Sequence, residues 1–490
     1  MSIQQLPGTS RRIAVVGGGI SGLAAAWRLT SGPDAPAVTV LEAASTVGGK
    51  LQLAEVGGLV VDVGAEAMLA RRPEGVGLIR EAGLGADLVH PATTAAGVVR
   101  DGRILPLPPG TVMGIPTDPA RLSGVLTPEE IAEVAAEPDR PAPPLESDVD
   151  VASWVTGRVG RAVVERLVEP LLGGVYAGHA SRLSLQATVP QLWELARQGG
   201  SVLAGLARFA PPPPPPPGPG EAPKPPAPFF AGIGGGVGRL PLALADRLAA
   251  RGAQVRTGVT VRELHRTPGG WRLVTGRADR PEVLEVDAVV LALPPAPAAR
   301  LLAQACPDAA AVLAEVETAG MAVVAMAVPR SQLDGVAGSG VLIPPVEGRP
   351  VKAATFSSAK WGWVNDLDPD LVLVRASLGR LGEEAVLQRD DGDLVATSVA
   401  ELSDLLGRRL APVASYVARW AGALPQYAVG HVDRVARIRA AVAGVPGLAV
   451  CGATYDGVGI AACIASADRA AEQVLAGGTG QVLAGGTMPV

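Results

Sequence analysis

The stretch RRIAVVGGGISGLAAAWRL, residues 11–29, decides the fold. Its apolar run IAVV is typical of a buried strand, and the small apolar residues after the glycines are typical of a helix. Between strand and helix lie Gly17, Gly19 and Gly22 in the spacing GxGxxG. The first glycine permits a tight turn, the second lets a pyrophosphate approach the backbone, and the third lets helix and strand pack closely. The stretch therefore predicts the strand, turn and helix that open a dinucleotide-binding fold.

An acidic residue ends the next expected strand, VTVLE. Glu42 lies 20 residues after Gly22, where a carboxylate can accept hydrogen bonds from a ribose diol. A glycine triplet alone is a weak signal, because glycine-rich turns are common. Strand, triplet, helix, strand and terminal acid together predict a dinucleotide site.

A second glycine-rich region indicates which dinucleotide is bound. TVGGKL places Gly49 and Lys50 soon after Glu42, and VDVGAEA places Gly64 in a turn after another strand. A glycine pair followed by a basic residue is a feature of FAD proteins of the glutathione-reductase-like group, whose longer cofactor needs more backbone amides. A β-hairpin turn with a solvated lysine is the alternative for this segment taken alone.

Length and charge limit the classes of function. A chain of 490 residues is longer than one hydrophobic core usually holds, so we expect two or three domains. Hydrophobic residues make up 48% of the chain and charged residues 18%, as in ordinary globular proteins. A net charge of -5 provides no basic field that would attract a polyanion, so we do not expect nucleic acid as a partner.

Cysteine and histidine are too few and too scattered for a disulfide framework or a metal site. Cys306, Cys451 and Cys463 include no CxxC pair, and the four histidines lack ligand spacing. We expect packed thiols in a reducing cytoplasm. No signal-peptide pattern and no apolar run of about 18 residues occurs, so a membrane-spanning helix is not expected, and peripheral membrane contact stays open.

Composition changes sharply at the tract PPPPPPPGPGEAPKPPAP, residues 211–228. Proline lacks an amide donor and has a fixed φ, so this tract predicts an exposed polyproline II loop or a disordered insert. A ligand for a proline-recognition domain is the alternative. Apolar periodicity predicts helices over 151–209, and α/β chemistry resumes over 229–296.

Strand-like runs between residues 320 and 380 predict a separate mixed sheet. Within KWGW, Trp361 and Trp363 alternate as strand residues do. They belong either to the core or to a cavity wall.

The C-terminal stretch GATYDGVGIAACIASADRAAEQVL, residues 452–475, combines a glycine-rich turn with a small-residue helix. Together with VGGGISGLAAAW, VGGK and RWAGALPQYAVGH, it resembles the protoporphyrinogen oxidase family of FAD-dependent haem-synthesis enzymes, within the amine-oxidase-like superfamily. The resemblance spans nearly the whole chain. GVLIPPVEGRPVKAATFSSAKW and LPPGTVMGIP are most similar to the Gram-positive and actinobacterial branch, which oxidises coproporphyrinogen III to coproporphyrin III.

The resemblance implies an α/β fold with three interleaved parts. These are an FAD-binding Rossmann-like domain of the glutathione-reductase and amine-oxidase type, a mixed-sheet substrate domain and a helical insert. The expected boundaries are 1–88, 229–296 and 421–477 for the FAD-binding domain, 89–112 and 297–420 for the substrate domain, 113–210 for the helical insert, 211–228 for the proline-rich loop and 478–490 for the tail.

The resemblance also assigns cofactor contacts by position. This sequence has GAEAM where many relatives show a different polar pattern after the glycine. The implied contacts are Gly17, Gly18, Gly19, Ile20, Ser21 and Gly22 at the pyrophosphate; Glu42 and Ala43 at the adenosine ribose; Val259 at the adenine; Gly49 and Lys50 beside the flavin; and Gly64, Ala65, Glu66, Ala67, Trp420, Ala453, Val458, Gly459 and Ile460 around the isoalloxazine.

The implied reaction removes six hydrogens from the porphyrinogen in three two-electron steps, and each step reduces one O2 to H2O2. A meso carbon gives hydride to flavin N5, and pyrrole protons leave by tautomerisation, so no dedicated catalytic base is expected. The FAD is expected to be non-covalent, because related oxidases that tether the flavin have their cysteine elsewhere in the motif.

A tetrapyrrole with four propionates requires a largely apolar cavity with cations at its rim. Each candidate cation has the alternative of an ordinary solvated surface charge. The candidates are Arg71, Arg72, Lys352 and Lys360 for the propionates, and Val112 and Met113 for the cavity wall.

Other functions remain open at this point. One is oxidation of protoporphyrinogen IX, and another is an amine oxidase or carotenoid desaturase of the same superfamily. A different class is a flavin-binding scaffold that delivers porphyrin to a ferrochelatase without catalysis. For the enzyme, a transient handover of product to a ferrochelatase is the expected partner contact.

Overall fold

A computed structural model describes residues 11–208 and 227–476. Nearly all of the proline-rich tract, and the whole tail 478–490, lie outside the described residues, so the expectations for these two segments stay predictions. Within the described ranges, no helix combines the length and the hydropathy that crossing a membrane requires.

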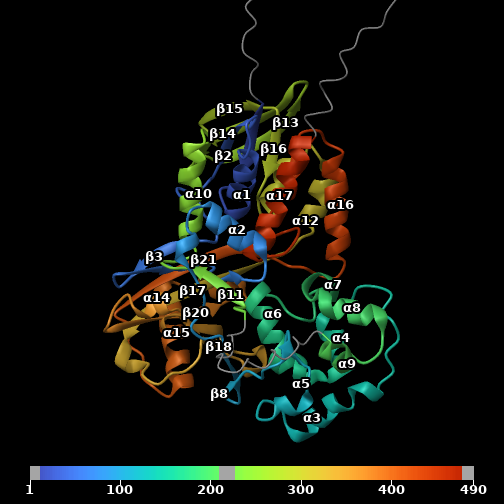
Figure 1. Cartoon of the computed structure of the whole chain (residues 1–490), viewed down its shortest axis with the longest axis vertical. Helices are drawn as coiled ribbons and strands as arrows, with labels where there is room; N and C mark the ends of the chain where they lie inside the picture. Colours follow the sequence, from blue (N-terminus) through green and yellow to red (C-terminus); the bar gives the residue numbers. More distant parts are fainter. Residues whose placement is uncertain (1–10, 209–226, 477–490) are drawn as a thin grey trace, which may run out of the picture.

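A five-stranded parallel sheet carries the first glycine motif (Figure 1). Its strands are apolar on both faces, which a parallel sheet needs because helices or sheets cover each side. Val15 in the central strand lies opposite Val40 on one side and Val290 on the other. The strand order is β12 (Gln254–Arg256), β2 (Ala37–Leu41), β1 (Arg12–Val16), β16 (Ala288–Leu291) and β22 (Leu448–Val450).

Two hydrophobic clusters cover the two faces of this sheet. Helices form the first cover: α1 (Ile20–Leu29), α2 (Pro73–Glu81), α10 (Arg239–Ala250) and α17 (Ile460–Ala476). The second cover consists of the antiparallel strands β13 (Val261–Thr267), β14 (Gly270–Arg277) and β15 (Arg280–Val286), with α11 (Pro295–Leu302), α12 (Pro307–Ala314) and α16 (His431–Ala443).

The position of α11 and α12 differs from the expected boundary at residue 297. Leu302 and Leu313 pack in one cluster with Val289 and Leu291 of β16, and not with the mixed sheet. The physical reason is that β16 is central in a parallel sheet, so its second face must be covered. The sequence run PPAPAARLL carries no sign of which sheet it covers.

A seven-stranded mixed sheet forms the second part. All neighbouring strands are antiparallel except β18 and β7, which run parallel. Helix α15 (Asp391–Leu406) covers one face through Leu394 and Leu402. The strand order is β21 (Ala414–Pro425), β17 (Thr318–Pro329), β20 (Leu371–Leu378), β19 (Val351–Phe356), β18 (Gly340–Leu342), β7 (Gly97–Arg100) and β8 (Arg103–Pro106).

The strand expected for Trp361 and Trp363 is wrong. Strand β19 ends at Phe356, and two short helices follow, α13 (Ser357–Lys360) and α14 (Gly362–Asn365). Trp361 separates them, and its amide donates to the Ser357 carbonyl at 2.9 Å. The indole of Trp361 is almost fully buried, while that of Trp363 is half-buried.

Short strands connect the two sheets. A hairpin, β3 (Leu53–Val56) and β4 (Leu59–Asp62), packs its apolar side chains against the second sheet. A small antiparallel sheet pairs β11 with two other short strands. It contains β5 (Met68–Leu69), β11 (Phe230–Ile233) and β6 (Leu88–Val89).

Helices predominate from residue 128 to 207, as the periodicity of 151–209 predicted, and they share one hydrophobic cluster beside the second sheet (Figure 1). A short strand pair, β9 (Thr111–Val112) and β10 (Ile115–Pro116), leads into them. The helices are α3 (Pro128–Ala135), α4 (Val151–Val159), α5 (Arg161–Val163), the π-helical turn η4 (Val164–Val168), α6 (Glu169–Tyr176), α7 (Leu185–Thr188), α8 (Pro190–Gln198) and α9 (Val202–Ala207).

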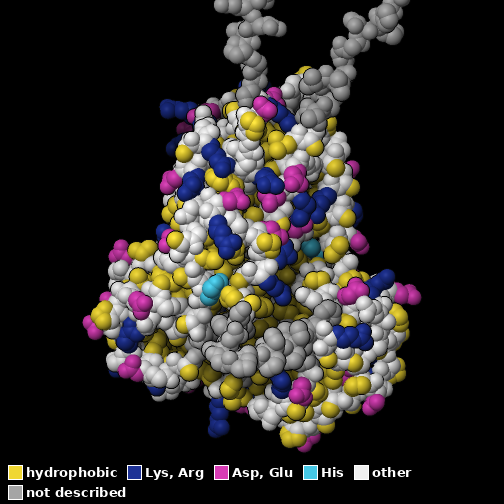
Figure 2. All heavy atoms as spheres, viewed as in Figure 1, with side chains coloured by type: hydrophobic (Ala, Val, Ile, Leu, Met, Phe, Trp, Pro, Cys, Tyr) yellow, Lys and Arg dark blue, Asp and Glu magenta, His cyan; other side chains and the backbone are white. Residues whose placement is uncertain are grey.

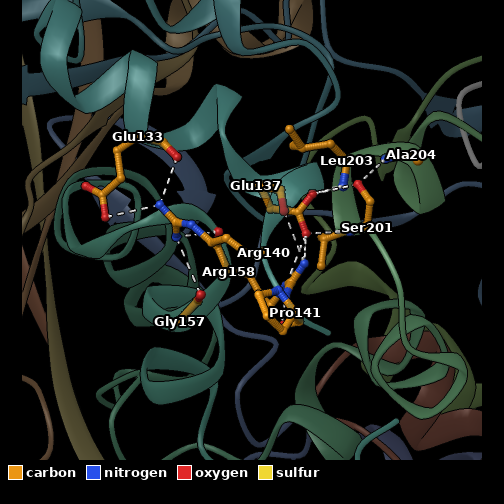
Figure 3. A network of polar contacts seen from close by, with 10 residues as sticks. Glu133, Glu137, Arg140, Pro141, Gly157, Arg158, Ser201, Leu203 and Ala204 are labelled. Atoms are coloured by element: carbon orange, nitrogen blue, oxygen red, sulfur yellow. Dashed lines mark hydrogen bonds and ion pairs between the residues drawn. The ribbon is translucent and has the colours of Figure 1, made fainter. Parts of the chain in front are cut away.

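A fully buried carboxylate ties this helical part together (Figure 3). Glu137 pairs with Arg158, whose Nε lies 3.0 Å from Oε1. Glu137 also accepts hydrogen bonds from the Ser201 hydroxyl at 2.6 Å and from the Val202 amide at 2.8 Å, at the start of α9. Burial alone would raise the pKa of Glu137, but the hydrogen-bond donors outweigh burial and bring the pKa below its ordinary value. Glu137 is therefore ionised.

We expect Glu137→Gln to lower the free energy of unfolding by about 3–5 kcal/mol, because Arg158 would keep a buried charge without its partner. Urea denaturation measures this change. Glu133→Gln is the matched control, since Glu133 is half-exposed and its pairing with Arg140 is worth at most about 1 kcal/mol. Equal small effects of both substitutions would contradict a structural role for the buried pair.

Candidate functional site

The turn between β1 and α1 leaves no space for side chains at two glycines. A Cβ on Gly22 would lie 1.8 Å from the Gly17 carbonyl oxygen, and one on Gly17 would lie 2.4 Å from the Ala292 carbonyl oxygen. Gly17 also has a φ of 109°, which disfavours any L side chain. Its amide donates to the Leu41 carbonyl at 2.8 Å. This contact holds the start of α1 directly at the ends of β1 and β2.

Gly19 differs from its neighbours, because the space around it is open. The nearest atom to a Cβ at this position would be the Gly49 Cα at 3.9 Å. The Gly48 amide donates to the Gly18 carbonyl at 2.9 Å, so the two glycine loops lie side by side. Ile20 and Ser21 form the first turn of α1, whose free amides face this space. An anion can reach the backbone here.

Glu42 lies beside the same turn, at the end of β2. Its carboxylate accepts hydrogen bonds from the Gly18 amide at 2.6 Å and from the Ala44 amide at 2.8 Å. The adjoining Ala43 is exposed. Val259, expected at the adenine, lies between β12 and β13, where its amide donates to the Glu42 carbonyl at 2.8 Å. The segment that joins β12 to β13 therefore runs beside Glu42.

Lys50, Gly64 and Trp420 form a second group of contacts. A Cβ on Gly64 would lie 2.0 Å from the Lys50 carbonyl oxygen and 3.3 Å from the Trp420 ring. The Ala65 amide donates to the same carbonyl at 3.0 Å. Burial lowers the pKa of the Lys50 ammonium, and the Cys463 thiol near it acts in the opposite direction. Lys50 therefore lies between this loop and the first turn of α17.

The C-terminal loop, residues 451–460, returns to the first glycine motif. The Cys451 Sγ lies 4.0 Å from the Ser21 carbonyl oxygen, and the Gly452 amide donates to the Ser466 hydroxyl at 3.2 Å. The Ala453 carbonyl accepts a hydrogen bond from the Tyr427 hydroxyl. Val458 is half-buried, Gly459 is exposed, and Ile460 starts α17. Both ends of the chain thus build one site.

Glu66 is held between two cations from the second sheet. Its carboxylate lies 2.6 Å from the Lys360 Nζ and 2.7 Å from the Arg375 Nη1. The Arg375 Nη2 donates to the Gly64 carbonyl at 2.6 Å. Burial acts to raise the pKa of Glu66, but Arg375 and Lys360 together bring it below its ordinary value. Ala67, the next residue, is half-buried.

Two of the four candidate propionate cations do not lie at an open rim. Lys360 is paired with Glu66. Lys352 is 4% exposed, and its Nζ donates to the Gly379 carbonyl at 2.8 Å, so its position differs from that expected. Arg72 is exposed and pairs with Glu74 at 2.9 Å. Arg71 is exposed, and its guanidinium lies 5.5 Å from the centre of the Phe229 ring.

Figure 2 shows the molecule hollowed between the second sheet and the helical part, with hydrophobic side chains on the visible walls. Val112 and Met113 are half-buried and pack on the helical cluster, as does Val458 from the C-terminal loop. Val175 on α6 is 44% exposed although it is apolar. These residues provide apolar side chains for the wall of a binding site.

Sequence reasoning missed Arg375. The signal was present, because LVLVRASL has one charged residue in an otherwise apolar strand. Lys and Arg are almost never fully buried without a partner, so a lone charge in a buried strand predicts an ion pair. The identity of that partner, Glu66, has no local signature.

A family model for flavin containing amine oxidoreductase matches residues 20–475. The chain belongs to this flavoenzyme family. Coproporphyrinogen III oxidase of Mycobacterium leprae is 38% identical over 473 residues, covering 96% of this chain and 99% of the relative. Coproporphyrinogen III oxidase of Bacillus subtilis is 29% identical over 95% of this chain and 98% of the relative.

A solved structure supports the same fold. A candidate protoporphyrinogen oxidase from Exiguobacterium sp. 255-15 superimposes with a TM-score of 0.82 at 32% sequence identity. The match covers 95% of this chain and 98% of that chain. The expected α/β architecture, with a Rossmann-like parallel sheet and a mixed second sheet, is confirmed.

The residues present fit the FAD that this flavoenzyme family implies. Backbone is open at Gly19, where a side chain is absent, and Gly49, Ala65 and Gly459 are exposed in loops that are otherwise well packed. The indole Nε1 of Trp420 is buried and has no hydrogen-bond partner within residues 11–208 and 227–476, although its ring touches the Gly64 position. These features provide backbone amides and a planar apolar contact.

We expect Gly19→Ala to fold normally but to bind FAD more weakly, because its methyl group would enter the space that the pyrophosphate requires. Gly22→Ala is expected to destabilise the fold itself. Flavin absorbance after desalting gives the FAD stoichiometry, and circular dichroism gives the fold. A Gly19→Ala protein that retains FAD as wild type does would contradict this position for the phosphates.

A pH dependence is expected from Lys352. Burial, assisted by Arg380 and opposed by Glu383, lowers the pKa of Lys352 to about 7. Between about pH 7 and pH 10 the unfolded chain keeps a proton that the folded protein lacks, so the folded protein gains stability as pH rises. Below pH 7 the folded protein bears the cost of a buried ammonium.

Lys352→Met removes this proton but keeps the length of the side chain. We expect the variant to be the more stable protein at pH 6.5, with an advantage that shrinks by at most about 1.4 kcal/mol per pH unit above pH 7. Urea unfolding of both proteins from pH 6.5 to 9.5 measures it. A difference that stays constant with pH would show that Lys352 does not titrate there.

Proposed function

We propose that this flavoenzyme oxidises coproporphyrinogen III to coproporphyrin III in haem biosynthesis, using non-covalent FAD and O2. The observation that carries the proposal is that Val458, in the C-terminal loop expected at the flavin, packs with Val112 and Met113 on the helical cluster, which lies at one side of the apolar hollow in Figure 2. A flat tetrapyrrole needs such a wide apolar site. Full-length relatives that are named coproporphyrinogen III oxidase support this substrate.

The bound FAD supplies the acceptor for a hydride at its N5 atom. The Gly18 amide is already bonded to Glu42, so Gly19 and the first turn of α1 would present backbone amides to the phosphates, and Glu42 would accept hydrogen bonds from the ribose. Trp420 and Val458 would pack beside the ring and exclude water from the reacting carbon. Six hydrogens leave the substrate in three such steps, and three O2 become three H2O2.

No side chain is required as a catalytic base. The charged groups near the expected ring position are engaged elsewhere, since Glu66 is paired with Lys360 and Arg375. Pyrrole protons can leave through tautomerisation to solvent. The protein therefore contributes orientation, exclusion of water and charge.

Non-covalent attachment agrees with the state of the thiols. Cys463 is buried in the first turn of α17, and burial raises the pKa of its thiol. Burial also raises the pKa of Cys451. A neutral thiol is a poor nucleophile, so neither group is prepared to bond to the flavin.

The propionates are assigned to the open side of the hollow. Arg71 is exposed and stacks near Phe229, which is itself 51% exposed. Its guanidinium has five donors that suit a carboxylate. Arg72 is the second candidate for binding a propionate, because its guanidinium is already paired with Glu74. Product handover to a ferrochelatase, a cytoplasmic location and peripheral membrane contact complete the proposal.

A two-substrate assay tests the proposal. We expect the purified FAD-loaded protein to oxidise coproporphyrinogen III with a higher kcat/KM than protoporphyrinogen IX, and to form three H2O2 per porphyrin. Porphyrin fluorescence and peroxide detection measure both quantities. A preference for protoporphyrinogen IX would transfer the assignment to that substrate, which the likeness to the Exiguobacterium structure makes the second candidate.

Absence of turnover on both substrates, with FAD fully bound, would contradict a porphyrinogen oxidase altogether. Anaerobic photoreduction followed by O2 then separates the remaining classes. An oxidase for another substrate reoxidises quickly, whereas a flavin-binding porphyrin carrier need not.

A further inference from the structure

The ion cluster of Glu66, Lys360 and Arg375 lies next to the backbone that we assign to the flavin ring. Its three side chains are 13%, 18% and 9% exposed, so the cluster is largely withdrawn from water. Arg375 touches the ring-lining loop directly, through the Gly64 carbonyl at 2.6 Å. The residue between Gly64 and Glu66, Ala65, is exposed.

One polar atom of this cluster lacks a partner among the described residues. The Arg375 Nε is buried and donates no hydrogen bond to any of them. The Trp420 Nε1 has the same property, and its ring touches the same Gly64. Two buried donors without a partner, on two side chains that both contact Gly64, leave hydrogen-bonding capacity unused beside this loop.

Two cations face one carboxylate in this cluster. Glu66 is ionised, so the three side chains taken together carry one positive charge. Asp62 also interacts with Arg375 and Glu66, and burial raises its pKa to about 6. Its carboxylate, however, accepts hydrogen bonds from the Val237 and Gly238 amides at 2.9 Å each, before α10. These amides hold the Asp62 carboxylate away from the ion pairs, but its negative charge, when ionised, also offsets part of the field of Arg375.

We propose that Lys360 and Arg375 stabilise the negative charge that the flavin ring gains on reduction, and that Glu66 attenuates their effect. The proposal rests on the proposed FAD site at Gly64 and Ala65. A hydride from a substrate C–H bond brings two electrons and one proton, so a neutral oxidised ring becomes a ring of charge -1. A fixed cation in a water-excluded site favours that product.

This function differs from a purely structural one in a measurable way. The cluster also ties the loop of Gly64 to β20 and α13, and any substitution that loosens this tie is expected to weaken FAD binding. A structural role therefore predicts the same direction for all three residues. An electrostatic role predicts opposite signs for the acid and for the cations.

The test is the midpoint potential of bound FAD, measured anaerobically against reference dyes with no porphyrinogen present. We expect Arg375→Gln and Lys360→Gln to lower the potential and Glu66→Gln to raise it. For Arg375→Gln, which touches Gly64, we expect about a tenfold shift of the reduction equilibrium, or about 30 mV for two electrons. Arg375→Lys keeps the charge and is expected to stay near wild type.

Arg349→Gln is the matched control, because Arg349 is paired with Glu401 and Asp404 of α15. It is expected to leave the potential unchanged. Unchanged potentials in the three cluster variants, or shifts in one common direction, would overturn the proposal. If Arg375→Gln loses FAD, the shifts in midpoint potential of Lys360→Gln and Glu66→Gln test the proposal alone. Opposite directions support it, and a common direction overturns it. Turnover of coproporphyrinogen III by the wild-type protein is measured separately. An error in the proposed substrate would therefore leave the midpoint-potential result unaffected.

Discussion

The structure depends on one backbone contact, the approach of the Gly17 carbonyl to Gly22. A methyl group at Gly22 would overlap this oxygen at 1.8 Å, so α1 can start at the end of β1 only if the side chain is missing. The start of α1 then points its free amides into the space that an anionic cofactor needs. The hydrogen bond between Gly48 and Gly18 joins the loop of residues 48–50 to the same turn. The close contact between Lys50 and Gly64 joins the loop of residues 64–67 to that loop.

The C-terminal segment completes this arrangement because its helix is built from small residues. Ala467 and Ala471 of α17 and Ala24 and Ala25 of α1 share one buried cluster, which lets the two helices pack closely. The loop before α17 is thereby brought to Ser21, although 430 positions separate Cys451 from it. The mixed sheet then adds Trp420 and Arg375 from the opposite side.

Backbone-driven features could be predicted from sequence, and long-range side-chain pairs could not. The turns within residues 11–29 and 452–475 could be predicted, because the local backbone geometry of such turns requires glycine at particular positions. Glu66 and Arg375 are 309 positions apart, and their contact depends on how the second sheet sits against the first. Lys352 looked like a rim cation, because nothing in VKAATF shows that its side chain turns inward to Gly379.

The central claim is that both ends of the chain and the mixed sheet form one FAD site beside an apolar hollow. A crystal structure of the FAD-loaded protein tests it most directly. The account predicts the pyrophosphate against Gly19 and the first turn of α1, and the isoalloxazine between Gly64 and Gly459 with one face open to the hollow. An isoalloxazine that contacts neither Gly64 nor Gly459, or one sealed off from the hollow, would contradict it.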